Sequence, residues 1–233
     1  MTTARVRSPQ FYARVAGCIY LGAMALGMFS QLFVLGRIIV PGDAAATAHN
    51  VVTSEALFRL GIVVDVVTFA SDVVIGWAFY QLLKGVDEAL ALLGALFRVT
   101  DAAILAVTTF SALITLRLLS GAEYLQPLDV RELQVLARLF VSARGLGFDV
   151  GFVFLGCGSA LFAYLLLVAR YVPRPLAAWG VFASLTLALG SLAQILSAGF
   201  AARAGMLHML PMFFYEVPLG LWLLLRGVRA AGA

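Results

Sequence analysis

The sequence predicts an all-α fold, a polytopic transmembrane helix bundle with six transmembrane helices. Of its 233 residues, 63% are hydrophobic and only 12% are charged, which is about half the charged share of a soluble domain. The apolar runs are about 20 residues or longer, the length at which a helix crosses a bilayer. They lack the alternation of polar and apolar residues that is typical of membrane barrel strands. Because only helices and closed barrels satisfy the backbone in lipid, we interpret the runs as helices.

Six apolar runs give the expected spans, which we place in a single transmembrane domain covering residues 1–233. No polar linker divides the chain. The first run is about 20 residues long and exceeds the roughly 7–15 residues of a signal-peptide core, so we expect it to be retained as a helix. The expected spans are residues 11–35, 57–83, 89–119, 147–169, 176–200 and 210–225.

Lysine and arginine residues at the span ends predict that both termini are cytoplasmic, because such residues concentrate on the cytoplasmic side. With the N-terminus inside, the inner ends hold Arg5, Arg7, Arg14, Lys84, Arg170, Arg174, Arg226 and Arg229. The outer ends then hold fewer, namely Arg37, Arg117, Arg131, Arg138, Arg144 and Arg203. The N-terminal cluster usually dominates the orientation. We therefore expect a multi-pass protein of the inner (plasma) membrane.

Two connections on the outer side are long enough to carry helices of their own. In the first, residues 36–56, Asp43 can cap a short helix. In the second, residues 120–146, Asp129 and Glu132 form a capping box that precedes an apolar stripe. We expect a short amphipathic interfacial helix there, between the third and fourth transmembrane helices.

Small residues within or beside the apolar runs are interpreted as features of helix packing. Gly145 precedes the fourth span and Gly147 is its first residue, and we interpret them as a flexible start of that helix. Cys18 and Cys157 lie within apolar runs and have no metal-ligand spacing, so they are interpreted as small buried residues at helix contacts.

Charged residues inside the second and third spans predict a buried ion network. A charge in the hydrocarbon core costs at least about 2.5–3.5 kcal/mol, so such residues should face the bundle interior and find partners. Asp72, Arg98 and Asp101 fall at similar depth, and Arg98 and Asp101 lie on one face of the same helix. Because their charges balance locally, we expect a structural network of these three residues.

A second set of polar residues predicts a pocket that opens outward and binds a small molecule or an ion. Asp65, Asp149 and Glu216 each lie in the outer half of a span, Gln194 falls at similar depth, and Arg59 lies near an outer helix end. The carboxylates outnumber the nearby arginines, so they would bind a proton, a cation or a hydroxylic ligand. An alternative stays open, in which separate pairs with Arg59, Arg144 and Arg203 only fix the packing of the helices.

The sequence has no motif for nucleophilic catalysis, for phosphate binding or for a metal site. His49 and His208 fall near the outer surface and are interpreted as ordinary interfacial histidines. We expect no cofactor, no metal and no nucleic-acid partner. Membrane lipid is the expected contact, and assembly into a homo-oligomer stays open.

Several short motifs are spread along the chain. They are IVPGDAAAT at residues 39–47, SEALFRLG at 54–61, GFDVG at 147–151, YVPR at 171–174 and LWL at 221–223, together with Asp65, Phe97, Arg98, Phe154, Gly156 and Glu216. With these motifs the chain resembles the bacterial membrane proteins catalogued as domain of unknown function 4386, from about Tyr12 to Val228. The resemblance implies a multi-helix membrane fold and, as the family name says, no known activity, so no catalytic residue is carried over.

Three functional classes stay open on the sequence. The first is a membrane protein that binds or translocates a small molecule or ion. The second is an intramembrane enzyme that acts on a lipid-like substrate with carboxylates as acid and base, against which the scarcity of histidine and of nucleophile motifs argues. The third is an accessory protein whose buried charges only set packing. The absence of a detectable inverted repeat argues mildly against common secondary transporter folds.

Overall fold

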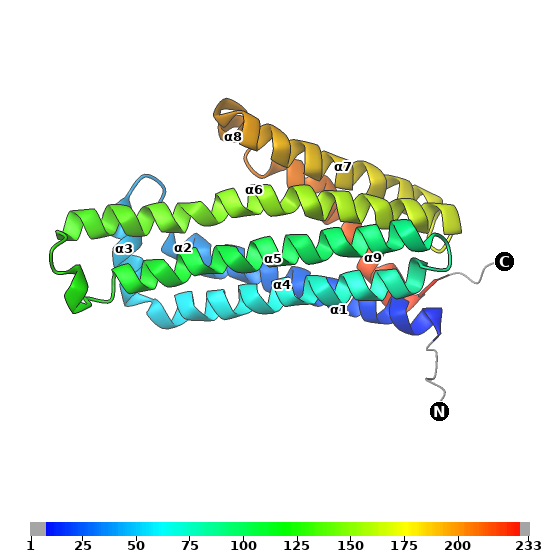
Figure 1. Ribbon diagram of the computed structural model, residues 1–233, viewed down its shortest axis with the longest axis horizontal. Helices are drawn as coiled ribbons and strands as arrows, with labels where there is room; N and C mark the ends of the chain where they lie inside the picture. Colours follow the sequence, from blue (N-terminus) through cyan, green and yellow to red (C-terminus); the bar gives the residue numbers. More distant parts are fainter. Residues whose placement is uncertain (1–7, 229–233) are drawn as a thin grey trace. The chain divides into compact units, whose positions relative to one another are not determined.

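The computed structural model describes residues 8–228, and within that range it contains helices and no strands (Figure 1). Six of its helical segments are long and apolar enough to cross a membrane. The predicted all-α, multi-pass membrane fold is therefore confirmed. Three of the arginines used for the orientation, Arg5, Arg7 and Arg229, lie outside the described residues.

The helical elements follow one another with short connections. They are α1 (Pro9–Phe29), the π-helix η1 (Ser30–Leu35), α2 (Gly36–Ile38), α3 (Ala44–Thr53), α4 (Glu55–Leu83), α5 (Glu88–Leu118), the 3₁₀ turn η2 (Glu123–Leu125), α6 (Val130–Ala169), α7 (Arg174–Leu196), α8 (Ala198–Ala204), the 3₁₀ turn η3 (Leu207–Met209) and α9 (Leu210–Leu225). The fifth expected span, 176–200, ends early because Ser197 is extended and its side chain accepts the Phe200 N–H, which starts α8.

α6 corrects the expectation of a separate interfacial helix between the third and fourth spans. The capping box forms as expected, because Asp129 Oδ1 accepts the Glu132 N–H at 2.8 Å and Glu132 Oε2 accepts the Asp129 N–H at 2.9 Å. The helix then continues without a break through Gly145 and Gly147 into the fourth span. Its 40 residues correspond to about 60 Å, about twice the thickness of the hydrocarbon core.

The contact of Gly147 with α5 explains why the chain has glycine at this position although the helix continues through it. A Cβ atom on Gly147 would lie 1.9 Å from Thr108 Cγ2 of α5. The glycine therefore permits close approach of two helices, as small residues do in membrane bundles. Glycine costs about 1 kcal/mol in a helix interior, which is too little to end a helix that is packed on both sides of it.

The chain packs as two compact units, where the sequence predicts one domain. Within the described range, unit 1 consists of residues 8–22, 71–102 and 149–228, and unit 2 consists of residues 23–70 and 103–148. The boundaries fall inside α1, α4, α5 and α6.

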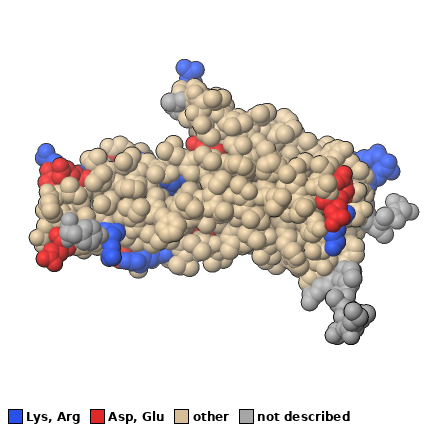
Figure 2. Space-filling view, viewed as in Figure 1, with Lys and Arg blue, Asp and Glu red and all other residues tan. Residues whose placement is uncertain are grey.

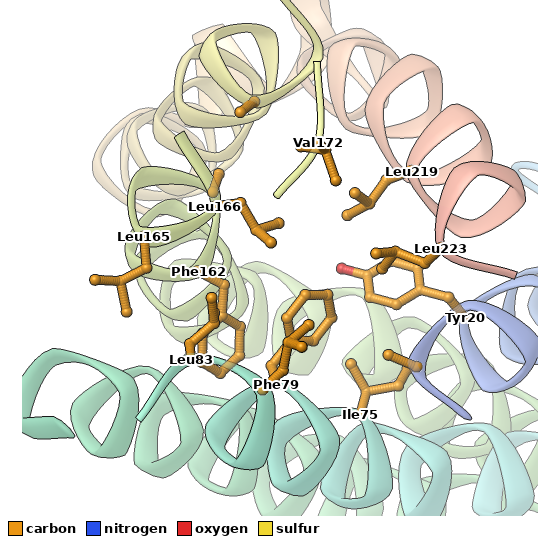
Figure 3. Close-up of a cluster of buried hydrophobic side chains, with 14 of the residues drawn as sticks. Tyr20, Ile75, Phe79, Leu83, Phe162, Leu165, Leu166, Val172, Leu219 and Leu223 are labelled. Carbon is orange, nitrogen blue, oxygen red and sulfur yellow. The ribbon is translucent and has the colours of Figure 1, made fainter. Parts of the chain in front are cut away.

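Unit 1 has an apolar core to which α1, α4, α6 and α9 contribute (Figure 3). Phe79 and Phe162 stack with their ring centroids 4.9 Å apart, and Tyr20 meets Phe79 edge-on at 6.0 Å. α7 and α9 lie against each other in this unit (Figure 1). Aromatic pairs of this kind contribute beyond their buried area.

Unit 2 has a smaller core around Val34, Ile38, Phe58 and Leu116. α3 begins at Asp43, whose Oδ1 accepts the Ala46 N–H at 2.8 Å, so this predicted cap is confirmed. The cap satisfies a backbone donor that the first turn of a helix would leave unpaired.

The surface of the helices carries many large apolar side chains. Examples are Trp77 on α4, Phe110 on α5, and Phe182 and Leu189 on α7, all of them exposed. Figure 2 shows a wide area without charged residues on the face in view. An exposed apolar surface this extensive is suited to lipid rather than to water.

Candidate functional site

Arg98 on α5 is the largest fully buried side chain of the described residues. Its Nη2 donates to Asp72 Oδ1 on α4 at 2.5 Å, and its Nη1 donates to Ser159 Oγ on α6 at 3.4 Å. The guanidinium also lies over the ring of Tyr20 on α1, 5.6 Å from the ring centroid. Four helices of unit 1 therefore converge on one buried cation.

Glycines bring the neighbouring helices close to Arg98. A Cβ atom on Gly76 of α4 would lie 3.1 Å from Arg98 Cβ. One on Gly158 of α6 would lie 2.9 Å from the Gly94 carbonyl oxygen and 3.5 Å from Arg98 Cγ. These glycines thus let the backbones of α4 and α6 lie close to the aliphatic part of the arginine side chain.

Asp101 lies one turn after Arg98 on α5 and is completely buried. Neither of its carboxylate oxygens has a hydrogen-bond partner among the described residues, and the same holds for Arg98 Nε. Asp101 interacts electrostatically with Arg98, Asp72 and Glu216. A buried carboxylate without hydrogen-bond donors is costly, so this group requires a proton or a ligand.

Glu216 on α9 is the third carboxyl group around Arg98. It lies beside Tyr20 and Arg98, within electrostatic range of Asp72. The preceding residue, Tyr215, packs where Gly180 of α7 leaves room, since a Cβ atom there would lie 2.3 Å from the tyrosine ring. We call Tyr20, Asp72, Arg98, Asp101, Ser159 and Glu216 the Arg98 cluster. Its three carboxyl groups face one guanidinium.

In unit 2, Asp65 on α4 forms a separate ion pair. Its Oδ1 accepts the Ser30 hydroxyl at 2.7 Å, and its Oδ2 accepts Arg144 Nη2 at 2.7 Å. Arg59 is exposed and pairs with Glu55, one turn earlier on the same helix, at 2.7 Å. Asp65 is thus neutralised by an arginine of α6, as the packing alternative expects.

In unit 1, His208 of η3 lies close to two further residues that were predicted to line the pocket, Gln194 and Asp149. Gln194 Nε2 lies 3.1 Å from His208 Nδ1 and also donates to the Gly205 carbonyl. Ser191 Oγ lies 3.3 Å from His208 Nε2. Asp149 on α6 is close enough to the imidazole to interact with it electrostatically.

The five residues expected to line one pocket therefore have different partners. Glu216 lies with Arg98, Asp149 and Gln194 lie around His208, and in unit 2 Asp65 and Arg59 each have their own ion pair. Of the expected network, Asp72 and Arg98 form an ion pair.

Sequence reasoning missed the roles of Tyr20, Ser159 and His208. Tyr20 is a polar side chain inside an apolar span, which is the only signal that it gives. Its contact with Arg98, and that of Ser191 with His208, join residues far apart in the sequence, which the spacing within one helix does not reveal. Cys18 is exposed rather than buried as expected, because a uniformly apolar span does not indicate which of its faces meets lipid.

No group of three or more His, Cys, Asp or Glu side chains that could hold a metal ion occurs in residues 8–228. The Arg98 cluster supplies many oxygen acceptors and one cation, all within a bundle of apolar helices. Such an arrangement can hold protons, or a small ligand that carries positive charge.

Of the comparisons with known proteins, the one with protein families gives a match, and it covers nearly the whole chain. No curated protein and no solved structure matches the sequence. The sequence does match the family described as "Domain of unknown function (DUF4386)" over residues 15–227, a range that contains the entire Arg98 cluster. The chain therefore belongs to this DUF4386 family of proteins.

Proposed function

We propose that this membrane protein binds a small cation, and translocates it, through the Arg98 cluster of unit 1. The observation that carries the proposal is the ratio of charged groups, since Asp72, Asp101 and Glu216 surround one guanidinium. One arginine balances one carboxylate. The other two carboxyl groups need a proton or a positively charged ligand, because unpaired buried charge is strongly unfavourable.

Asp101 supports a binding site over a purely structural network. In a network that only fixes packing, each buried polar atom is expected to have a partner. Asp101 has none among the described residues, although it is completely buried. A bound proton or an N–H donor of a ligand would satisfy it.

The donors and acceptors of the cluster define the ligand class. The unsatisfied atoms are mainly carboxylate oxygens, so the ligand supplies positive charge and hydrogen-bond donors. A proton meets this requirement with the smallest volume, and a small protonated amine is the next candidate. Both are consistent with the lack of a metal-holding group in the described part of the chain.

The orientation in the membrane is part of the same proposal. Lysine and arginine at the helix ends favour a plasma-membrane protein with both termini in the cytoplasm. In this orientation Glu216 lies in the outer half of α9, whereas Asp72, Arg98 and Asp101 lie in the inner halves of α4 and α5.

The intramembrane enzyme remains the second candidate, and one contact favours it. Ser191 Oγ faces His208 Nε2, as a nucleophile faces its base. Ser191 is completely buried, however, and the other ring nitrogen of His208 lies 3.1 Å from Gly205 O. The contact is better explained as a support for the chain reversal between α7 and α9.

The proposal is tested by measuring thermal unfolding of the purified protein between about pH 5 and pH 9, with and without methylammonium as the probe cation. Wild type should become more stable as protons or methylammonium are added, because both neutralise the two carboxyl groups of the Arg98 cluster that Arg98 does not balance. Asp101→Asn should reduce this dependence, because it removes one of these two groups. Glu123→Gln, which changes an exposed carboxylate, is the matched control and should retain it. Wild-type stability that is independent of both additions would overturn the proposal.

A further inference from the structure

A cavity in unit 2 lies beside the Asp65–Arg144 ion pair. Its apolar wall includes Val34, Phe58, Ile62, Ala112 and Val141, and its polar end is formed by Ser30, Asp65, Ser111 and Arg144. Its volume is about 20 Å³, which accommodates about one water-sized group. The hollow is thus mostly apolar, with a few polar groups that converge at one end.

The hydrogen bonds at the polar end indicate what such a ligand would offer. Both oxygens of Asp65 are engaged, one by the Ser30 hydroxyl and one by Arg144. The guanidinium of Arg144 still has free N–H donors. Apart from its bond to Asp65, its one other hydrogen bond to the described residues is to Gln31, at 3.5 Å. A guanidinium has five N–H donors, so this end of the cavity has donors to spare and favours a ligand with an oxygen acceptor.

The charge of the ligand follows from the ion pair. Asp65 and Arg144 balance each other, and their side chains are only 10% and 14% exposed. A charged ligand would add an uncompensated charge to this largely buried site. The apolar wall favours hydrocarbon, so the ligand is an uncharged molecule with an oxygen at one end.

The π-helix η1 borders both the cavity and an exposed apolar surface. Ser30 and Val34 of this segment line the cavity, while Leu32 and Phe33 between them are exposed. Gly61 lets α4 lie close to η1, because a Cβ atom there would be 2.8 Å from Val34 Cγ1. Single π-helical turns occur frequently at functional sites. A chain that leaves the cavity along η1 therefore meets an apolar surface.

We infer that this cavity, which we call the Arg144 cavity, binds the hydroxyl end of a neutral long-chain alcohol. The oxygen accepts a hydrogen bond from Arg144, and the alkyl chain lies along the exposed side chains of η1 in the surrounding lipid. This site is independent of the Arg98 cluster and uses a different ligand chemistry.

Photolabelling tests the inference with three probes of equal length: hexadecanol, hexadecanoate and hexadecylamine, each with a diazirine in the chain. The full protein is labelled in detergent, and the labelled residues are mapped by mass spectrometry. We expect the alcohol to label the segment around residues 30–35 at least about tenfold more than the acid or the amine. Equal labelling by all three probes would overturn the inference, as would labelling spread evenly along the helices.

Two substitutions on α6 separate the cavity from general attachment to lipid. Val141→Ile adds one methylene group beside the small cavity without changing any charge and should sharply reduce the selective label. Val135→Ile makes the same change at an exposed position on the same helix and should leave the label unchanged. If Val141→Ile retains the full selective label, the ligand does not occupy the cavity.

A third variant tests the role of Arg144 without leaving a buried charge. Asp65→Asn combined with Arg144→Gln keeps the site neutral, whereas Arg144→Gln alone leaves Asp65 unpaired and risks misfolding. The double variant should fold and lose the preference for the alcohol. A preserved preference in this variant would show that the guanidinium does not hold the oxygen.

Discussion

Arg98 Nη2 lies 2.5 Å from Asp72 Oδ1, so a buried ion pair joins α5 to α4 within unit 1. The arginine side chain is 2% exposed and the aspartate side chain 14%. At this depth the pair is weakly screened by solvent, and each charge depends on the other for its stability. Removal of one partner should therefore lower the free energy of unfolding more than replacement of both partners by apolar side chains.

Arg98→Ala should destabilise the protein by about 3–5 kcal/mol, because it leaves buried carboxylates without their cation. Asp72→Asn should cost less, since the amide stays neutral and can still accept a hydrogen bond from Arg98. Unfolding in detergent, followed by circular dichroism as denaturant is added, measures both changes. A smaller loss for Arg98→Ala than for Asp72→Asn contradicts the assignment of Arg98 as the central cation.

Gly147→Ala should destabilise the protein by about 1–3 kcal/mol, because overpacking at a tight helix contact forces neighbouring atoms to move. The new Cβ would lie 1.9 Å from Thr108 Cγ2. The Thr108 hydroxyl donates to the Leu105 carbonyl at 2.6 Å, and rotation of the side chain would disturb this bond. Thr108→Ala in the same chain should recover most of the loss, as measured by thermal unfolding.

Gly145→Ala is the matched control for this contact. No atom lies within 4 Å of a Cβ at Gly145, so the substitution meets open space. Alanine stabilises a helix interior by about 0.5–1 kcal/mol relative to glycine. Equal destabilisation by the two substitutions would mean that the helix is locally open near these glycines.

The sequence was sufficient for the features that depend on local chemistry. The six spans follow from the length of apolar runs that lipid requires. The helix starts at Asp43 and Asp129 follow from side chains that cap a backbone three residues away. The continuation of α6 through Gly147 was missed, because the benefit of that glycine lies in its contact with Thr108 on another helix.

The candidate site was less predictable, because it depends on contacts between helices. Depth along each span groups Glu216 with Asp65, yet depth does not indicate the direction in which a helix face points. The structure places Glu216 beside Tyr20 and Arg98, and Asp65 with Ser30 and Arg144. The contacts between helices show that Glu216 belongs to a cluster with more carboxyl groups than arginines, and that Asp65 is paired with one arginine.

His208→Ala should loosen the chain reversal between α7 and α9. The imidazole lies within hydrogen-bonding distance of Ser191 and of the Gly205 carbonyl, so its loss removes two supports of this segment. Hydrogen exchange should become faster in α8 and remain unchanged in α5. Ser191→Ala, which removes one contact, should give a smaller effect. Uniform acceleration along the chain would indicate a global loss of stability instead.

Reporter fusions at the two termini should place both in the cytoplasm. The six membrane-crossing segments return the chain to its starting side, and the basic residues favour the cytoplasm for that side. An alkaline phosphatase fusion should be inactive at either end, and a fluorescent protein fusion should be bright at both. Activity of alkaline phosphatase at one end alone would require an odd number of crossings.

The assignment of Glu216 to the Arg98 cluster gives the last prediction. In an Arg98→Gln background three carboxyl groups remain together without a cation, and their repulsion adds to the cost of burial. Adding Glu216→Gln should recover about 1–2 kcal/mol of the stability lost through Arg98→Gln, because neighbouring sites are not additive. The exposed Glu123→Gln change should recover nothing in the same background. The coupling is obtained from the free energies of unfolding of four chains, measured at one pH. These are the wild type, Arg98→Gln, Glu216→Gln and the double variant. If the effects of Arg98→Gln and Glu216→Gln add within about 0.5 kcal/mol, the two residues do not interact, and the excess of carboxyl groups around Arg98 is smaller than proposed.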